Sequence, residues 1–186
     1  MSSPPPQPQP SPASAARPTR RRFLRRWVLG GGALALGGLT LHQSTGYADP
    51  PFPLLALSGK EAAVLLAAAA RILDGLPPGV AQEAARWVDG YLARQAPEVR
   101  REVRALLHLV EHAPPLLARR LSRFTRLGPE EQDAYLRAFA GSQRALLRQG
   151  WGGLKSLLLM GAYGQPATWD PIGYSGPLPH PLARPR

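Results

Sequence analysis

Cysteine does not occur in the 186-residue chain. Its absence excludes disulfide bonds, thiolate zinc sites, iron–sulfur clusters and covalent attachment of c-type haem within this protein. The absence says little about the compartment, because an oxidising space permits disulfides without requiring them. The compartment has to be inferred from other parts of the sequence.

Acidic residues do not occur before Asp49, although the whole chain has 12 Asp and Glu and a net charge of +11. Six of its 23 Lys and Arg precede residue 27, so the chain from residue 49 onward carries a net charge of only +5. The arginines there share helix faces with glutamates and lack the interleaved aromatic residues of a nucleic-acid surface. We therefore expect no nucleic-acid partner.

Most catalytic signatures are also missing, since the sequence has no Gly-x-Ser-x-Gly elbow and no phosphate-binding loop. One exception is the spacing of His108, Glu111 and His112, which spells the motif of inverted zinc peptidases. In that motif the two His bind zinc and the Glu activates water. The simpler interpretation places both His on the polar flank of a helix near its C-terminus. A self-sufficient, exported zinc-dependent hydrolase is kept as the alternative function.

Residues 1–48 differ in composition from the rest of the chain and are interpreted as a leader. Residues 2–19 are dominated by Pro, Ser, Gln and Ala, and we expect them to be disordered. The heptad that starts at Thr19 has a hydroxyl residue, two arginines, a free position, Phe, Leu and a basic residue. It resembles the full consensus of a twin-arginine export signal. The residues that carry this resemblance are Arg20, Arg21, Phe23, Leu24 and Arg25.

An apolar, glycine-rich run follows the heptad, from Trp27 to Leu41. As a helix its 15 residues would span about 22 Å, which is short of the roughly 30 Å hydrocarbon core of a bilayer. The run therefore favours a signal peptide over a membrane anchor. Small residues at Gly46 and Ala48 predict cleavage after Ala48. We expect the twin-arginine translocase to be a partner, and assembly with another protein to precede export.

From Leu57 onward the apolar residues recur at helical spacing, and no strand pattern competes. The fold is therefore predicted to be all-α, a single small bundle of five to six helices within residues 49–186. Ser58 and Glu61 predict a capping box, and Asp133 with Arg137 predicts an ion pair one turn apart. The expected helices cover 58–73, 80–94, 97–113, 116–124, a segment opened by Pro129, and 142–162.

The tail, residues 164–186, is predicted to be irregular because it contains six prolines. It also carries Trp169, Ile172 and Tyr174, whose apolar surfaces favour contact with something apolar. Two possibilities stay open at this point. The tail could lie on its own bundle, or it could bind a partner protein.

Several blocks of sequence resemble subunit 3 of gluconate 2-dehydrogenase, the small subunit of membrane-associated flavoprotein dehydrogenases. The resemblance covers most of residues 57–179. It rests on Leu57-Ser58 with the Ala/Leu-rich helix after it, the run 127–136, the helix 154–157 leading to 160–163, and Trp169 with residues 172–177. The last two blocks are the more specific.

The resemblance implies a non-catalytic accessory subunit with no cofactor of its own. Its partner would be a large FAD-bearing dehydrogenase subunit of the glucose-methanol-choline type, often with a c-type cytochrome subunit. The complex would act in the periplasm, associated with the inner membrane, after export of the folded assembly. The residues expected to bind the partner are Lys155, Tyr163, Trp169, Ile172, Gly173, Tyr174, Gly176 and Pro177.

Overall fold

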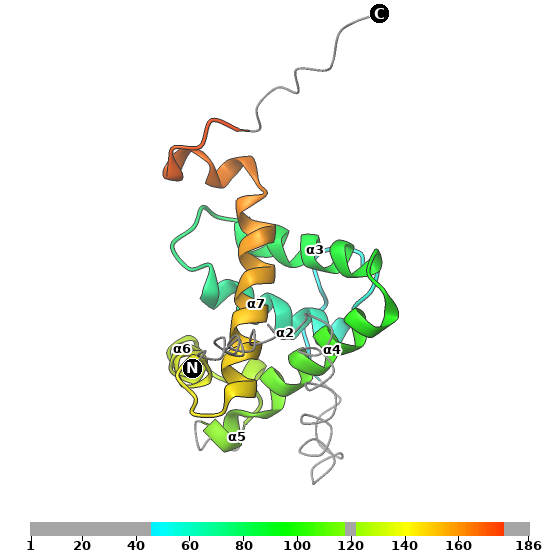
Figure 1. Ribbon diagram of the computed structural model, residues 1–186, viewed down its shortest axis with the longest axis vertical. Helices are drawn as coiled ribbons and strands as arrows, with labels where there is room; N and C mark the ends of the chain where they lie inside the picture. Colours follow the sequence, from blue (N-terminus) through cyan, green and yellow to red (C-terminus); the bar gives the residue numbers. More distant parts are fainter. Residues whose placement is uncertain (1–45, 118–121, 177–186) are drawn as a thin grey trace, which may run out of the picture.

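The computed structural model describes residues 46–117 and 122–176 of the chain, and in these residues it confirms an all-α fold without strands. The longest helix, α7, runs through the middle of the bundle, and residues 164–176 follow it at one end (Figure 1). The α-helices are α2 (Gly59–Ile72), α3 (Val80–Ala93), α4 (Pro97–His112), α5 (Pro114–Leu117), α6 (Pro129–Ala140) and α7 (Ala145–Tyr163). Three short 3-10 helices accompany them: η1 (Phe124–Arg126), η2 (Pro166–Thr168) and η3 (Asp170–Ile172).

Local signals in the sequence set the starts of these helices. The Ser58 hydroxyl accepts a hydrogen bond from the Glu61 amide, and the Glu61 carboxylate accepts one from the Ser58 amide at 2.7 Å. This is the predicted capping box, and it satisfies backbone donors at the start of α2. Pro97 and Pro129 occupy first-turn positions of α4 and α6, where a proline removes no helical hydrogen bond.

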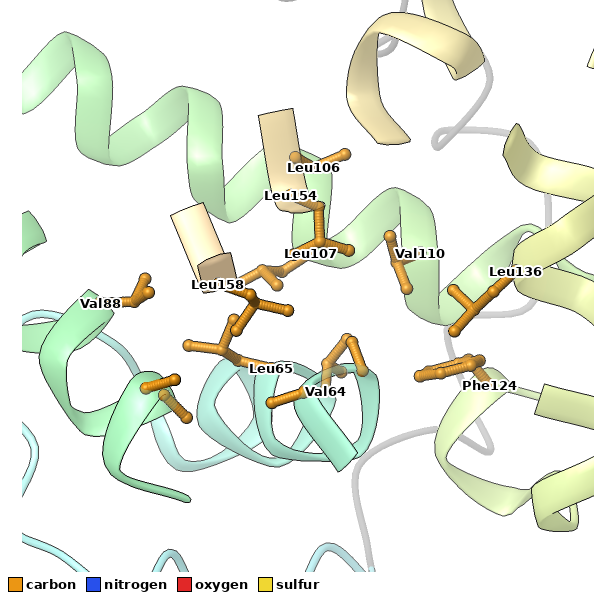
Figure 2. Packing of buried hydrophobic residues seen from close by; sticks show 14 of the residues in the cluster. Val64, Leu65, Val88, Leu106, Leu107, Val110, Phe124, Leu136, Leu154 and Leu158 are labelled. Carbon is orange, nitrogen blue, oxygen red and sulfur yellow. The ribbon is translucent and has the colours of Figure 1, made fainter. Parts of the chain in front are cut away.

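The core forms where α2, α3, α4 and α7 meet, and it is filled by fully buried aliphatic side chains (Figure 2). Leu65, Val88, Leu107 and Leu158 each come from a different one of these helices. The most extensive helix contact is between α3 and α7. At the crossing, a Cβ added to Gly161 would lie 2.9 Å from the carbonyl oxygen of Ala84. Only glycine allows the two backbones to approach this closely.

A second layer of packing joins α6 to the rest of the bundle through aromatic rings. Tyr135 lies between Phe124 and Phe139, with ring centroids 5.4 and 5.9 Å apart. Its hydroxyl donates a hydrogen bond to the Val110 carbonyl at 2.9 Å. Burial raises the pKa of Tyr135, so this hydroxyl stays protonated and available as a donor.

Two local predictions need correction. The helix expected over 116–124 does not reach its predicted end: α5 already begins at Pro114, and Arg123, which follows the undescribed residues 118–121, has an extended backbone and turns its guanidinium toward Glu111. The carboxylate of Asp133 accepts two hydrogen bonds, of 2.8 and 2.9 Å, from Arg71 of α2. These bonds lower the pKa of Asp133, and the charge of Arg137, the predicted partner on its own helix, lowers it further. In both places a contact between elements outweighs a local preference.

The described part of the chain contains no helix that is both long enough and apolar enough to cross a membrane.

Candidate functional site

The C-terminal cap, which we define as the last residue of α7 together with the described part of the tail (residues 163–176), is folded onto the end of α7. Thr168 is buried, and its hydroxyl hydrogen-bonds to the carbonyls of Ala162 and Gln165, at 3.0 and 2.8 Å. The amide of Gln165 donates to the Gly161 carbonyl at 2.8 Å and to the Val80 carbonyl at 3.3 Å. The cap is therefore fastened to the ends of both α7 and α3.

Trp169 organises the cap. Its indole N–H donates to the Tyr163 carbonyl at 3.0 Å. The rings of Trp169 and Tyr174 pack edge to face, with their centroids 5.4 Å apart. Gly176 has φ +99, and a Cβ there would lie 3.0 Å from the indole ring. Gly173 ends η3 in the left-handed conformation with φ +69. Both glycines are thus required for the chain to wrap around Trp169.

The cap leaves several large apolar side chains facing solvent. We call them the C-terminal patch: Met160, Tyr163, Ile172 and Tyr174, each between 42% and 55% exposed. Among the described residues, four of the six exposed large hydrophobic side chains are in this short span of sequence. Exposed apolar residues gathered in one region are typical of an interaction surface.

The structure brings together most of the residues predicted to bind a partner. Tyr163, Trp169, Gly173, Tyr174 and Gly176 all belong to the C-terminal cap.

The other predicted partner-binding residues are placed differently. Ile172 is in the C-terminal patch, and Lys155 is exposed on α7 two turns before Tyr163, about 12 Å away along the helix axis. Pro177 lies outside the described residues. Met160 was missed by the sequence analysis, although its position on the solvent side of α7 follows from helical spacing.

The residues of the zinc motif are drawn into different interactions. Glu111 is buried, and its carboxylate accepts hydrogen bonds from the hydroxyls of Tyr47 and Thr125 at 3.0 and 2.7 Å. His108 and His112 are exposed and stack with ring centroids 6.3 Å apart. Glu111 therefore points into the protein, away from any water that these His could hold. Among the described residues, no group of three or more His, Asp or Glu is placed to hold a metal ion.

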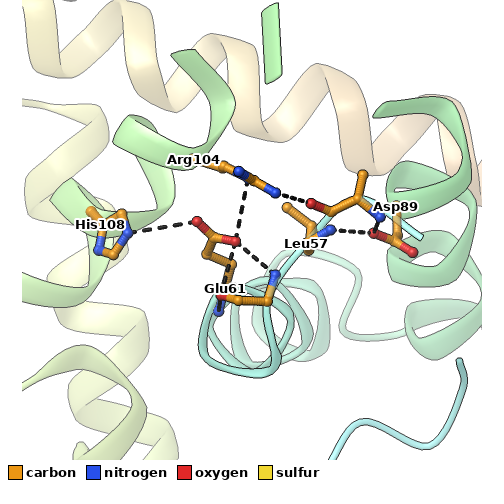
Figure 3. Close-up of polar contacts among 7 residues, drawn as sticks. Leu57, Glu61, Asp89, Arg104 and His108 are labelled. Carbon is orange, nitrogen blue, oxygen red and sulfur yellow. Dashed lines mark hydrogen bonds and ion pairs between the residues drawn. The ribbon is translucent and has the colours of Figure 1, made fainter. Parts of the chain in front are cut away.

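His108 instead pairs with Glu61 of α2 (Figure 3). Its Nε2 lies 3.6 Å from Glu61 Oε1, and Arg104 Nε lies 3.5 Å from Glu61 Oε2. Burial alone would raise the pKa of Glu61, but the hydrogen bonds from His108 and Ser58 and the charge of Arg104 lower it to about 2. The hydrogen bond to Glu61 raises the pKa of His108. The pair thus joins α2 to α4.

Asp89 of α3 is a second buried carboxylate beside this pair (Figure 3). It accepts hydrogen bonds from the backbone amides of Leu55, Ala56 and Leu57 at 2.7, 2.9 and 2.8 Å. Arg104 donates to the Ala56 carbonyl from the other side. These contacts fix the segment that leads into α2, so Asp89 is explained by a structural role.

Two cavities near the candidate residues are both open to solvent. One of about 360 Å³ lies between residues 46–49 and the start of α2 at residues 58–60. The other, of about 170 Å³, lies between α3 and the end of α7 and is lined by Trp87, Gly161 and Gln165. The second cavity adjoins the base of the C-terminal cap.

The sequence matches the family described as gluconate 2-dehydrogenase subunit 3 over residues 59–176, which is well over half of the chain. The chain belongs to the gluconate 2-dehydrogenase subunit 3 family. This confirms the resemblance seen in the sequence. No curated protein and no solved structure matches the chain.

The ends of the match coincide with elements of the fold. The subunit 3 family match begins at Gly59, the first residue of α2, and ends at Gly176, the glycine that packs on Trp169. The C-terminal cap is therefore part of what makes this chain a subunit 3 protein. The family is one of subunits within a dehydrogenase complex.

The leader residues stand apart from this match. The export-signal residues Arg20, Arg21, Phe23, Leu24 and Arg25 lie outside the described residues. The predicted cleavage site, Ala48, is described and is exposed. The contacts of its neighbour Tyr47 with α4 could not be predicted from the sequence of this subunit 3 protein, because no local pattern links residues so far apart.

Proposed function

We propose that this protein is a non-catalytic accessory subunit that binds the large, FAD-bearing subunit of a periplasmic sugar or alcohol dehydrogenase through the C-terminal patch. It assists assembly of the complex and its export by the twin-arginine route. The large subunit is of the glucose-methanol-choline type, and a c-type cytochrome is a further candidate subunit. The flavin and any haem belong to those partners. The complex then resides in the periplasm, associated with the inner membrane.

The exposure of the C-terminal patch is the observation that carries the docking part of this proposal. Its apolar side chains stand on a segment that internal hydrogen bonds and the Trp169 ring already hold in place. A surface that is ordered before binding loses little conformational entropy when a partner covers it. Tyr side chains at such a surface combine apolar area with a hydroxyl that can hydrogen-bond across an interface.

The docking test is co-purification of the tagged protein with the large subunit, comparing two double variants. Ile172→Ser/Tyr174→Ser removes exposed apolar groups from the patch and is expected to lower the recovery of the flavoprotein at least tenfold. Leu55→Ser/Leu116→Ser removes the other two large apolar side chains that are exposed among the described residues, and should leave recovery unchanged. Equal recovery with both variants would show that the patch does not bind the partner.

The export test uses the Arg20→Lys/Arg21→Lys variant beside the wild type. Twin-arginine receptors distinguish arginine from lysine, so the variant should strand both this chain and the flavoprotein in the cytoplasm. The measurement is flavin absorbance and immunodetection in periplasmic, membrane and cytoplasmic fractions. A flavoprotein whose location does not depend on these two arginines contradicts the export role.

A further inference from the structure

The chain just before α2 is bound to the folded bundle at Tyr47. The Tyr47 hydroxyl donates to Glu111 Oε1 at 3.0 Å, and the guanidinium carbon of Arg123 lies 4.0 Å from the centre of the Tyr47 ring. Arg123 Nη2 also donates to the carbonyl of Gly46 at 3.3 Å. We call these four residues, Gly46, Tyr47, Glu111 and Arg123, the N-terminal latch.

The inner half of the latch is a buried ion pair. Glu111 and Arg123 are only 2% and 4% exposed, and their closest atoms, Oε1 and Nε, are 3.5 Å apart. Thr125 adds hydrogen bonds to Glu111 from its amide at 3.1 Å and its hydroxyl at 2.7 Å. Charges this deeply buried are costly unless their geometry is fixed by partners, and Tyr47 is one of these partners.

The latch depends on the whole fold. Tyr47 and Glu111 are 64 residues apart in sequence, and Gly46 and Arg123 are 77 apart. Neither contact can form until α4 and the segment before η1 are in place. The latch therefore closes only on a folded domain.

We propose that the N-terminal latch is a permanent part of the mature protein, so that Tyr47 is retained and the folded chain is not cleaved after Ala48. The inference rests on the proposed function, since only an exported chain meets a signal peptidase. It reverses the expectation drawn from the small residues at Gly46 and Ala48. The sequence matches a small-x-small cleavage site, but the folded protein does not present this site in the conformation that a peptidase binds.

The geometry of the docked segment explains why the peptidase cannot bind the site. A peptidase binds its substrate as an extended strand, through backbone hydrogen bonds on both sides of the scissile bond. Gly46 has φ +88, which is incompatible with an extended strand, and its carbonyl is already bonded to Arg123. Cleavage after Ala48 therefore requires the segment to leave the latch first, and its rate is reduced by the population of the undocked state.

The first arm of the test is cleavage of the purified full chain by purified type I signal peptidase in detergent micelles. Glu111→Gln/Arg123→Met opens the latch from the inside without altering the sequence that the peptidase reads. Exchanging a buried ion pair for neutral groups of similar volume generally leaves a protein folded, and circular dichroism checks this. Cleavage after Ala48 should be about tenfold faster than in the wild type, corresponding to about 1.4 kcal/mol of docking free energy.

The matched control is Glu98→Gln/Arg101→Met, which makes the same two substitutions at an exposed ion pair of α4. It should be cleaved at the wild-type rate. If the buried double variant does not fold, Tyr47→Phe takes its place, and a several-fold faster cleavage is expected. Its control is Tyr91→Phe, on a tyrosine of α3 that stacks on Trp87. Equal rates for the wild type and the latch variants overturn the inference.

The second arm is the intact mass of the protein recovered from the periplasm and membrane. A chain that starts at Gly46 or earlier supports the inference, and one that starts at Tyr47 or later overturns it while leaving the export proposal standing. A chain found only in the cytoplasm contradicts the export proposal. In that case the cleavage rates in micelles still decide whether the latch protects the site.

Discussion

Asp89 illustrates how one side chain can fix a segment of backbone. Its carboxylate is 1% exposed and lies among the amides of Leu55, Ala56 and Leu57, all within 2.9 Å. Hydrogen bonds to an ionised acceptor are about twice as strong as neutral ones, and three of them offset the cost of burying the charge. The segment that they hold delivers Ser58 to the start of α2.

Asp89→Asn tests this role. The amide NH₂ of Asn would face backbone N–H groups and leave at least one of them without an acceptor, so the free energy of unfolding should fall by about 2–3 kcal/mol. Urea denaturation followed by circular dichroism measures the change. Asp74→Asn is the control, because Asp74 is 70% exposed and its loss should cost less than about 0.5 kcal/mol. Similar small losses in both variants would contradict the assigned role.

Glu61 and His108 should give the protein a stability maximum in mildly acidic solution. The pKa of Glu61 is lowered from 4.5 to about 2, so its contribution is complete above pH 4.5 and is lost as the pH falls toward 2. The pKa of His108 is raised from 6.5, so its contribution is present below pH 6.5 and is lost as the pH rises through the higher folded value. Between about pH 4.5 and 6.5 both contributions are present.

Thermal unfolding at pH 3, 5.5 and 8 can check this expectation. The difference in Tm between the wild type and Glu61→Gln should be largest at pH 5.5 and shrink toward both extremes. The acidic loss reflects the buried Glu61 carboxylate and is on the order of 3 kcal/mol, while the basic loss is smaller because His108 is largely exposed. A pH-independent difference would mean that the two groups are not coupled.

At the scale of elements, the glycines of α7 differ in what surrounds them. Gly161 lies against the backbone of α3, with room for no further atom, whereas Gly152 and Gly153 on the same helix have nothing within 4 Å of an added Cβ. A glycine within a helix is about 1 kcal/mol less favourable than alanine. The same substitution should therefore have opposite signs at the two places.

Gly161→Ala is expected to destabilise the protein by about 1–3 kcal/mol, because α3 and α7 must move apart to admit the methyl group. Gly153→Ala should stabilise it by about 0.5–1 kcal/mol through helix propensity alone. Denaturation midpoints of the two variants measured in parallel give the comparison. Stabilisation by both substitutions would show that the close crossing of α3 and α7 is not required.

The sequence predicted the elements that depend on local signals. Ser58 with Glu61, Pro97 and Pro129 determined where helices begin, and apolar spacing determined which faces are buried. It failed where a contact joins distant elements, as for Asp133 with Arg71. Sequence spacing can reveal only partners on the same helix. The order within the cap was missed for the same reason.

The candidate site shows the same division. Trp169, Ile172 and Tyr174 stood out because apolar residues in a proline-rich tail need something to contact. What they contact was left open between the bundle and a partner, and the structure shows the described part of the tail fastened to α7 and α3 of its own bundle. Trp169 packs within the cap, while Ile172 and Tyr174 face solvent. The latch could not be predicted, since Glu111 was interpreted through the two His beside it in sequence.

In the whole molecule, the proposed partner binding at the C-terminal patch and the proposed protection from cleavage at the N-terminal latch belong to separate parts of the fold. The latch joins residues 46 and 47 to α4 and to the residue before η1, whereas the cap extends α7 at the end of the bundle near the start of α3 (Figure 1). A partner that covers the cap therefore need not touch the latch. Binding and processing should then be separable by mutation.

Hydrogen exchange can locate the partner on the whole subunit. Backbone amides of residues 163–176 should exchange at least tenfold more slowly in the purified complex than in the isolated subunit, because a bound surface excludes water and suppresses local opening. The backbone amides of α6 should exchange equally in both states. This helix packs on the bundle through Tyr135 and Phe139 and is far from the cap in sequence. Mass spectrometry of peptides from matched samples gives both values at once. If protection appears in α6 and not in residues 163–176, the partner binds another face and the C-terminal patch has to be explained without it.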